Sequence, residues 1–291
     1  MSKLIFGGDP EYFASYKENN KYYVVPPVHF RTVFEVKPAV WDRKHPVFFN
    51  IDGIKIHEDG VAFEFAITPQ HSVMDLHNGF MHGLDILREF VGKYDLEVFT
   101  KPTINFDVSK YNDESDSFLM CLLFGCDPDK DAFNISQKES IIDALHHEYR
   151  YGGGHLHLSG AKVFQENPID SIKTMAITIG NYVVGNSPYP DLEKQRTFNY
   201  GKPGKFRVQE YGSLFNGIPY TDIGIEYRTP SNTWTTSPEL SEGIEYWAYK
   251  ALDILEQGRA TDIINQFSEI TVDSILSANQ EQCLSVLNSL Q

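Results

Sequence analysis

Short runs of β-branched and aromatic residues alternate along the chain with longer segments whose apolar residues recur every three or four positions. The short runs are typical of strands, in which successive side chains point to opposite faces of a sheet. They lie at 2–6, 21–25, 61–67, 116–124, 154–159 and 223–228. Strand segments are therefore expected from the N-terminal residues onward, well past the middle of the chain.

The longer segments predict helices, because a period of three to four residues places apolar side chains on one helix face. They cover 73–91, a stretch opened by the capping residues Ser136 and Glu139, 168–183, 237–258 and 259–291. Helices and strands follow one another without a regular β-α-β order, which favours an α+β fold with a largely antiparallel sheet flanked by helices. No linker divides the chain, so we expect one domain over 1–258 and a C-terminal helical extension over 259–291.

Acidic side chains outnumber basic ones. The 291 residues include 40 aspartates and glutamates against 25 lysines and arginines, a formal net charge of −15. Affinity for a nucleic-acid backbone comes from clustered basic side chains, so direct binding to duplex DNA is disfavoured. The hydrophobic fraction of 41% is sufficient for a buried core.

The chain lacks the sequence signals of secreted and membrane proteins. Its cysteines, Cys121, Cys126 and Cys283, are odd in number and lack the spacing of a zinc site, which favours a reducing compartment. The most apolar run, 118–126, is less than half as long as a membrane-spanning helix. The N-terminal residues also lack the regions of a signal peptide. We expect a cytoplasmic protein with no membrane partner.

Charged residues recur two positions apart in segments with strand character, a spacing that points both side chains to one face. Asp9 and Glu11 form the first such pair, directly after two glycines. Glu64 lies in a later strand segment between Ala62 and Ala66. These small neighbours leave room beside the carboxylate for a hydrated ion or a nucleotide.

Two further pairs follow the same spacing. His155 and His157 come after three glycines, 152–154, which allow the backbone to approach a ligand closely. Glu226 and Arg228 form the last pair. If these strands belong to one sheet, its polar face is a floor lined by carboxylates and histidines.

Such a floor is suited to hard divalent cations, because carboxylates with histidine are ligands for Mg²⁺ or Mn²⁺. The segment 194–207 precedes the last pair and contains five basic side chains, Arg196 and Arg207 among them. Basic side chains in this position would neutralise phosphate groups. Together these features indicate phosphoryl transfer from a nucleotide.

Each feature alone has an ordinary alternative. The Asp9 segment also fits a turn, Glu64 fits a solvent-facing strand position, and the last pair fits a surface ion pair. The basic segment also fits a solvated loop, and two histidines at this spacing occur in plain strands. The joint occurrence of all the pairs favours a functional site over these alternatives.

The same segments resemble, in order, the signature blocks of the phage-type carboxylate–amine ligases, the COOH–NH2 ligase type 2 family of the glutamine synthetase-like superfamily. The blocks are 8–13 (GDPEYF), 59–65 (DGVAFEF), 125–128 (GCDP), 150–157 (RYGGGHLH) and 224–231 (GIEYRTPS). The resemblance extends from residue 5 to residue 235. It implies a glutamine synthetase-like catalytic domain whose antiparallel sheet forms the active-site floor, in the host cytoplasm if a phage encodes the chain.

The resemblance also implies roles for individual residues. The implied ligands of two or more Mg²⁺ or Mn²⁺ ions are Asp9, Glu11, Glu64, His155 and Glu226. The implied contacts to ATP are His157, Arg196, Arg207 and Arg228, and the implied catalytic residues are Arg228, Glu226 and Glu64. The chain departs from glutamine synthetase at Asp9, where that enzyme has glutamate. It also shows no counterpart of the N-terminal domain through which that enzyme completes its site between subunits, so ring assembly is not implied.

The implied activity is ATP-dependent amide formation, in which ATP phosphorylates a carboxylate and an amine then displaces the phosphate. The partners would be a carboxylate and an amine, as small molecules or within peptides. One alternative is a phosphotransferase of the same fold that acts on a guanidino or carboxyl group. Another is a non-catalytic protein that binds nucleotide or metal. A cupin-type oxygenase is disfavoured because the next acid after the histidines, Glu166, lies too far along the chain.

Overall fold

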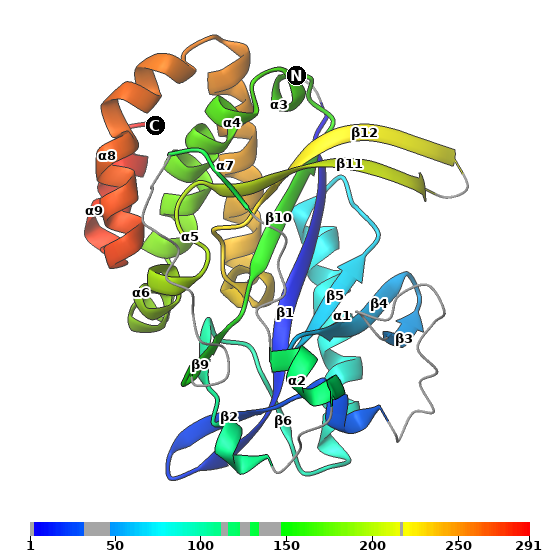
Figure 1. Ribbon diagram of the computed structural model, residues 1–291. Helices are drawn as coiled ribbons and strands as arrows, with labels where there is room; N and C mark the ends of the chain where they lie inside the picture. Colours follow the sequence, from blue (N-terminus) through cyan, green and yellow to red (C-terminus); the bar gives the residue numbers. More distant parts are fainter. Residues whose placement is uncertain (1–2, 32–46, 112–115, 123–128, 134–146, 216–217) are drawn as a thin grey trace.

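A computed structural model describes residues 3–31, 47–111, 116–122, 129–133, 147–215 and 218–291. Its centre is a 12-stranded sheet, and most helices pack against one face of that sheet (Figure 1). The main path of strands is β3 (Val47–Ile51), β4 (Ile54–Asp59), β5 (Ala62–Ile67), β1 (Ile5–Glu18), β10 (Gly154–Ser159), β12 (Ile218–Tyr227), β11 (Lys205–Phe215) and β8 (Lys130–Asp131). Neighbours on this path are antiparallel.

The second half of β1 extends the sheet beyond this path. Its partners there are β2 and β6, and β7 and β9 continue from β2. These strands are β2 (Lys21–Val25), β6 (Glu97–Phe99), β7 (Thr103–Asn105) and β9 (Tyr149–Tyr151). The pairing of β2 with β7 is parallel. The predicted α+β class, with a largely antiparallel sheet flanked by helices, is confirmed.

Several of the helices begin at a capping side chain or a proline. They are α1 (Val73–Gly92), α2 (Asp116–Leu122), α3 (Val163–Glu166), α4 (Pro168–Met175), α5 (Asn181–Gly185), α6 (Pro190–Asn199), α7 (Pro238–Glu256), α8 (Ala260–Ser277) and α9 (Gln280–Asn288). A π-helical turn (Ala176–Gly180) joins α4 to α5, and short 3-10 helices cover Pro27–Phe30, Val108–Lys110 and Asn232–Thr236. Ser72 caps α1 by accepting a hydrogen bond from the amide of Met74.

The predicted helices at 73–91, 168–183, 237–258 and 259–291 agree with these elements to within a few residues. The predicted strand at 116–124 is wrong over its described part, because residues 116–122 form α2. Phe118, Cys121 and Leu122 are buried in one cluster with Val24 and Phe106. Their spacing is helical, and a short apolar run does not by itself distinguish a strand from a buried helix. The capping pair at 136 and 139 lies outside the described residues.

Alternation along the strands divides the sheet into an apolar and a polar face. Phe6 of β1, Leu156 and Leu158 of β10, and Ile225 and Tyr227 of β12 are fully buried in the main hydrophobic core. That core also contains the apolar faces of α1, α4 and α7. The residues between them on each strand therefore point to the opposite face, away from these helices.

The C-terminal helices pack against α4, α5 and α6 and share the main core through Ile264, Phe267 and Leu287. The chain turns between α7 and α8 at Gly258, whose φ is +70°. The division at residue 258 stays a prediction. No helix within the described ranges combines the length and the apolar character that crossing a membrane would require.

Candidate functional site

Strand register brings the predicted polar pairs onto one face of the sheet. Asp9 lies opposite His155 between β1 and β10, and His157 lies opposite Glu226 between β10 and β12. On the other side of β1, Glu11 lies opposite Glu64. Residues directly opposite each other in an antiparallel pair share a face, so these side chains form one continuous polar surface. Two groups within it have the geometry of a cation site.

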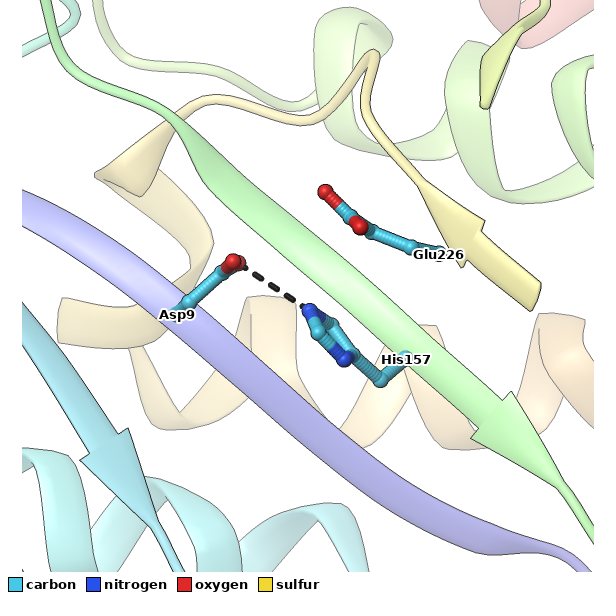
Figure 2. Close-up of side chains that lie close together, drawn as sticks. All are labelled: Asp9, His157 and Glu226. Atoms are coloured by element: carbon cyan, nitrogen blue, oxygen red, sulfur yellow. Dashed lines mark ion pairs between the residues drawn. The ribbon is translucent and has the colours of Figure 1, made fainter. Parts of the chain in front are cut away.

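The first group, here named cluster A, consists of Asp9, His157 and Glu226 (Figure 2). One ligand atom from each residue lies within 4.8 Å of the others. His157 Nε2 is 3.2 Å from Asp9 Oδ1. Figure 2 shows the three side chains converging from β1, β10 and β12, with helices behind the sheet. Two carboxylates and one imidazole fit Mg²⁺ or Mn²⁺.

The second group, cluster B, consists of Glu11, Asp59 and Glu64, whose ligand atoms also lie within 4.8 Å of one another. Glu64 Oε1 is 2.8 Å from His57 Nε2 on β4. Glu11 Oε2 accepts a hydrogen bond of 2.7 Å from the amide of Gly153. Three carboxylates at this separation fit a hard divalent cation through oxygen ligands alone.

Asp59 and His57 were missed as site residues by the sequence analysis. Both lie on β4, two positions apart, with the same spacing as the predicted pairs. The antiparallel pairing of β4 with β5 places His57 opposite Glu64 and Asp59 opposite Ala62. Their spacing indicates that the two side chains share a face of β4. Only the pairing of β4 with β5 shows that this is the face that carries Glu64.

Cluster B is an electrostatically repulsive site. Burial raises the pKa of Glu64 well above its usual value, and the neighbouring carboxylates of Asp9 and Asp59 raise it further. Burial also raises the pKa of Glu11, although His155 opposes the shift. Carboxylates that are hard to ionise together are stabilised by a cation between them.

Cluster A is balanced by nearby histidines. Burial alone would raise the pKa of Asp9, but His155 and His157 outweigh it and lower that pKa. The pKa of Glu226 is also lowered, because the histidines and Arg228 together outweigh burial and the charge of Asp9. The histidines and Arg228 thus favour the ionised form of both carboxylates, which is the form that binds a cation.

Arg228 and Arg207 lie beside cluster A. Arg228 is 3% exposed and forms an ion pair with Glu226, and its Nε is 3.1 Å from Asp129 Oδ1. Arg207 lies opposite Glu226 on β11, with Nη1 3.8 Å from Glu226 Oε1 and Nε 3.2 Å from Asp129 Oδ1. Asp129 thus bridges two guanidinium groups, a role with no signal in the sequence.

Arg196 lies on α6, and the structure gives it different partners. Its guanidinium is fully buried and donates to the carbonyl oxygens of Thr229, at 2.7 Å, and Pro230, at 3.0 Å. Burial lowers its pKa, and the carboxylate of Glu193 opposes that shift. These contacts fix the chain directly after Arg228. The contact of Arg196 with ATP, implied by the resemblance, stays a prediction.

His155 lies between the two clusters. Its Nδ1 is 3.1 Å from Asp9 Oδ1, and its Nε2 is 2.9 Å from the hydroxyl of Tyr200. Tyr200 follows α6 and was not identified from the sequence. Both ring nitrogens of His155 thus contact side chains, whereas His157 belongs to cluster A. The metal-ligand role of His155 and the ATP contact of His157, both implied by the resemblance, stay predictions.

The glycines at 152–154 approach other segments of the chain. A Cβ on Gly154 would lie 2.2 Å from the carbonyl oxygen of Ser231. The amide of Gly154 donates to the carbonyl of Pro230, and Asn232 Nδ2 donates to the carbonyl of Glu11. In the structure the backbone of these glycines lies close to the segment 230–232, and the predicted approach to a ligand stays a prediction.

Comparison with known protein families finds no match, and no curated protein matches the chain. Among solved structures, the chain is similar to one in the crystal structure of the complex between prokaryotic ubiquitin-like protein Pup and its ligase PafA. The likeness covers 99% of this chain and 65% of that chain, with 11% sequence identity and a TM-score of 0.42. This chain therefore spans less than two thirds of the length of the protein it matches.

Proposed function

We propose that the chain is an ATP- and Mg²⁺-dependent ligase that joins a carboxylate to an amine through an acyl phosphate. One observation carries the proposal. Clusters A and B lie side by side on one sheet face, and Arg207 and Arg228 adjoin cluster A. The order of these residues along the chain agrees with the resemblance to glutamine synthetase-like ligases, and the α+β architecture is compatible with it.

The residues of both clusters fit divalent cations. Asp9, His157 and Glu226 would hold one ion, and the carboxylates of cluster B would hold another. When bound, Mg²⁺ or Mn²⁺ would neutralise the phosphate oxygens of ATP and the substrate carboxylate, so that the two anions can approach. We assign His157 to the ligands of cluster A, and we assign His155 to the orientation of Asp9.

Arg228 and Arg207 would neutralise the phosphates of ATP. Arg228 is held from two sides by Glu226 and Asp129, which fixes its planar guanidinium before any substrate binds. Preorganised donors of this kind stabilise charge that develops in a transition state. Glu226 therefore has two roles in the proposal, as a ligand in cluster A and as the residue that orients Arg228.

The reaction has two steps. A carboxylate oxygen of the substrate attacks the γ-phosphorus of ATP, the bond to the bridging oxygen breaks, and ADP leaves. The amine nitrogen then attacks the carbonyl carbon, loses a proton, and expels inorganic phosphate. Glu64 would hold the reacting phosphoryl end through the ion of cluster B. Water must be excluded between the steps, because it would hydrolyse the acyl phosphate.

The test is an ATP turnover assay with Mg²⁺ against pooled carboxylates, with and without pooled amines. The ligase releases ADP and inorganic phosphate only when both pools are present, and hydroxylamine in place of the amine yields a hydroxamate. Glu64→Gln abolishes this turnover, whereas Glu89→Gln retains it, because Glu89 is exposed on α1.

Other outcomes contradict the proposal. ADP release without an amine, with phosphate retained on the acceptor, would identify the phosphotransferase. ATP binding without turnover in any pool would favour the non-catalytic alternative. Equal turnover in Glu64→Gln and the unchanged protein would show that the activity does not depend on cluster B.

A further inference from the structure

We propose that Tyr200 is a positioning residue that couples clusters A and B through its hydroxyl group. This inference deepens the proposed function and rests on its metal sites, but not on the identity of the carboxylate or amine. Tyr200 lies in the connection between α6 and β11, outside every strand of the polar face. It nevertheless reaches Glu11 on β1, His155 on β10 and Arg228, which directly follows β12.

The hydroxyl of Tyr200 has three partners. It lies 2.9 Å from His155 Nε2, 3.4 Å from Glu11 Oε1 and 3.2 Å from Arg228 Nη2. His155 supports Asp9 of cluster A, Glu11 belongs to cluster B, and Arg228 is the buried guanidinium beside both. One oxygen atom therefore contacts a residue of cluster B, a residue beside Asp9 of cluster A, and Arg228.

Hydrogen-bond chemistry assigns a direction to these contacts. The hydroxyl of Tyr200 has one hydrogen and donates it to Glu11 Oε1 of cluster B. Its oxygen accepts from Arg228 Nη2 and from His155 Nε2. The other ring nitrogen of His155, Nδ1, lies 3.1 Å from Asp9 Oδ1 and 3.3 Å from Arg228 Nη1. The contacts from Glu11 through Tyr200 and His155 to Asp9 therefore connect a carboxylate of cluster B with a carboxylate of cluster A.

The ring of Tyr200 is held in place independently of the clusters. Its amide donates to the carbonyl of Arg196 at 2.7 Å, and its ring lies 5.1 Å from the Arg196 guanidinium and parallel to the ring of Tyr151. The next residue, Gly201, has a φ of +67°, and a Cβ there would lie 2.5 Å from Arg196 Nη1. This support keeps the ring fixed when only the hydroxyl is removed.

The variant Tyr200→Phe removes the hydroxyl and retains the ring. The probe is Mn²⁺ alone, without nucleotide or substrate, with free Mn²⁺ followed by electron paramagnetic resonance. Residues that orient metal ligands typically contribute ten- to hundredfold to metal affinity. We expect Tyr200→Phe to bind Mn²⁺ about tenfold more weakly than the unchanged protein, with a similar Tm. A role limited to structure would change the Tm and leave the affinity constant.

Tyr151→Phe is the matched control. The hydroxyl of Tyr151 contacts Asn199 and His147, and its ring remains stacked in the variant. Its removal should leave Mn²⁺ affinity within twofold of the unchanged protein. Equal affinity of Tyr200→Phe and Tyr151→Phe would overturn the proposal, and so would the absence of Mn²⁺ binding in the unchanged protein.

The test separates this inference from the proposed function. If the unchanged protein binds Mn²⁺ but turns over no ATP with any carboxylate and amine, the ligase proposal fails while the affinities still decide the role of Tyr200. If turnover is present and the two variants bind Mn²⁺ equally, the inference about Tyr200 fails and the ligase proposal stands.

Discussion

Glu11 on β1 and Glu64 on β5 lie directly opposite each other on the polar face of the sheet. Like charges in this position destabilise an antiparallel pair. Burial raises the pKa of both carboxyl groups, and Asp59 adds a third acidic side chain. The three adjacent carboxyl groups therefore destabilise the metal-free protein, and a bound cation would stabilise them.

This relationship predicts the effect of Glu64→Gln on stability. Without metal, the variant should be more stable than the unchanged protein by about 0.2–1 kcal/mol, because one opposing charge is removed. With Mn²⁺ at about one hundred times its Kd, the unchanged protein should gain about 2.7 kcal/mol, and the variant much less. Thermal unfolding with and without Mn²⁺ measures both effects. A metal-free variant that unfolds at a lower temperature than the unchanged protein would contradict the prediction.

Arg228→Lys should abolish most ATP turnover although the charge is retained. The guanidinium contacts both Glu226 and Asp129, and lysine cannot reproduce two directed contacts. We expect turnover to fall by about a hundredfold or more. Arg207→Lys provides the comparison, with a smaller loss, because the Arg207 side chain is 25% exposed and solvent partly replaces its contacts. Equal losses in the two variants would show that burial of Arg228 is not decisive.

Arg196→Met should destabilise the fold. Glu193 is buried beside Arg196 on α6, where burial raises its pKa. Removal of the guanidinium leaves the carbonyl oxygens of Thr229 and Pro230 without their donor and Glu193 without a nearby positive charge, which together should cost about 3–5 kcal/mol. Urea unfolding measures this loss, and Lys194→Met on the same helix, at an exposed position, should change the free energy of unfolding by less than about 0.5 kcal/mol.

The double variant Glu193→Gln with Arg196→Met tests the cause of that loss. It should recover part of the stability, since the carboxylate left without its partner charge is neutralised. A double variant as unstable as the sum of the single variants would mean that the two side chains act independently. In that case the contacts of Arg196 with Thr229 and Pro230 would account for its contribution.

Gly154→Ala should be destabilising and Gly92→Ala should not. A Cβ at residue 154 would collide with the main chain of Ser231, whereas a Cβ at residue 92 meets no atom within 4 Å. The collision should lower the free energy of unfolding by about 1–3 kcal/mol. At residue 92 the reduced entropy of the unfolded chain should raise it by about 0.4–1 kcal/mol. Urea titrations of both variants check the two signs, and a neutral Gly154→Ala would disprove the close packing.

Much of the polar face could be predicted from the sequence because strands have a period of two. The spacing of Asp9 with Glu11 and of His155 with His157 determines that each pair shares a face, whatever the neighbours are. Likewise, the helical period of 73–91 places Leu76, Phe80 and Leu84 on one side, and the structure buries them all. Local periodicity is sufficient to predict which side chains share a face, because this depends on the geometry of a single strand or helix.

Contacts between distant segments could not be predicted in this way. Asp129 reaches Arg207 and Arg228, and Tyr200 reaches Glu11, only through the folded chain. The prediction of a strand at 116–124 was wrong for a related reason. Phe118 and Leu122 pack in one cluster with Val24 and Phe106, which lie far away in the sequence. No alternation or spacing within these segments specifies their partners.

The strand order has a consequence for the time at which the polar face forms. Among the strands that the structure describes, β1 with Asp9 comes first along the sequence and β12 with Glu226 comes last, with β10 between them in space. During synthesis, cluster A is incomplete until residue 226 has left the ribosome. Pairings of such large sequence separation slow folding, because the chain must close a long loop first. The strands that carry cluster B, β1, β4 and β5, are therefore synthesised long before Arg207 and Arg228, which adjoin cluster A.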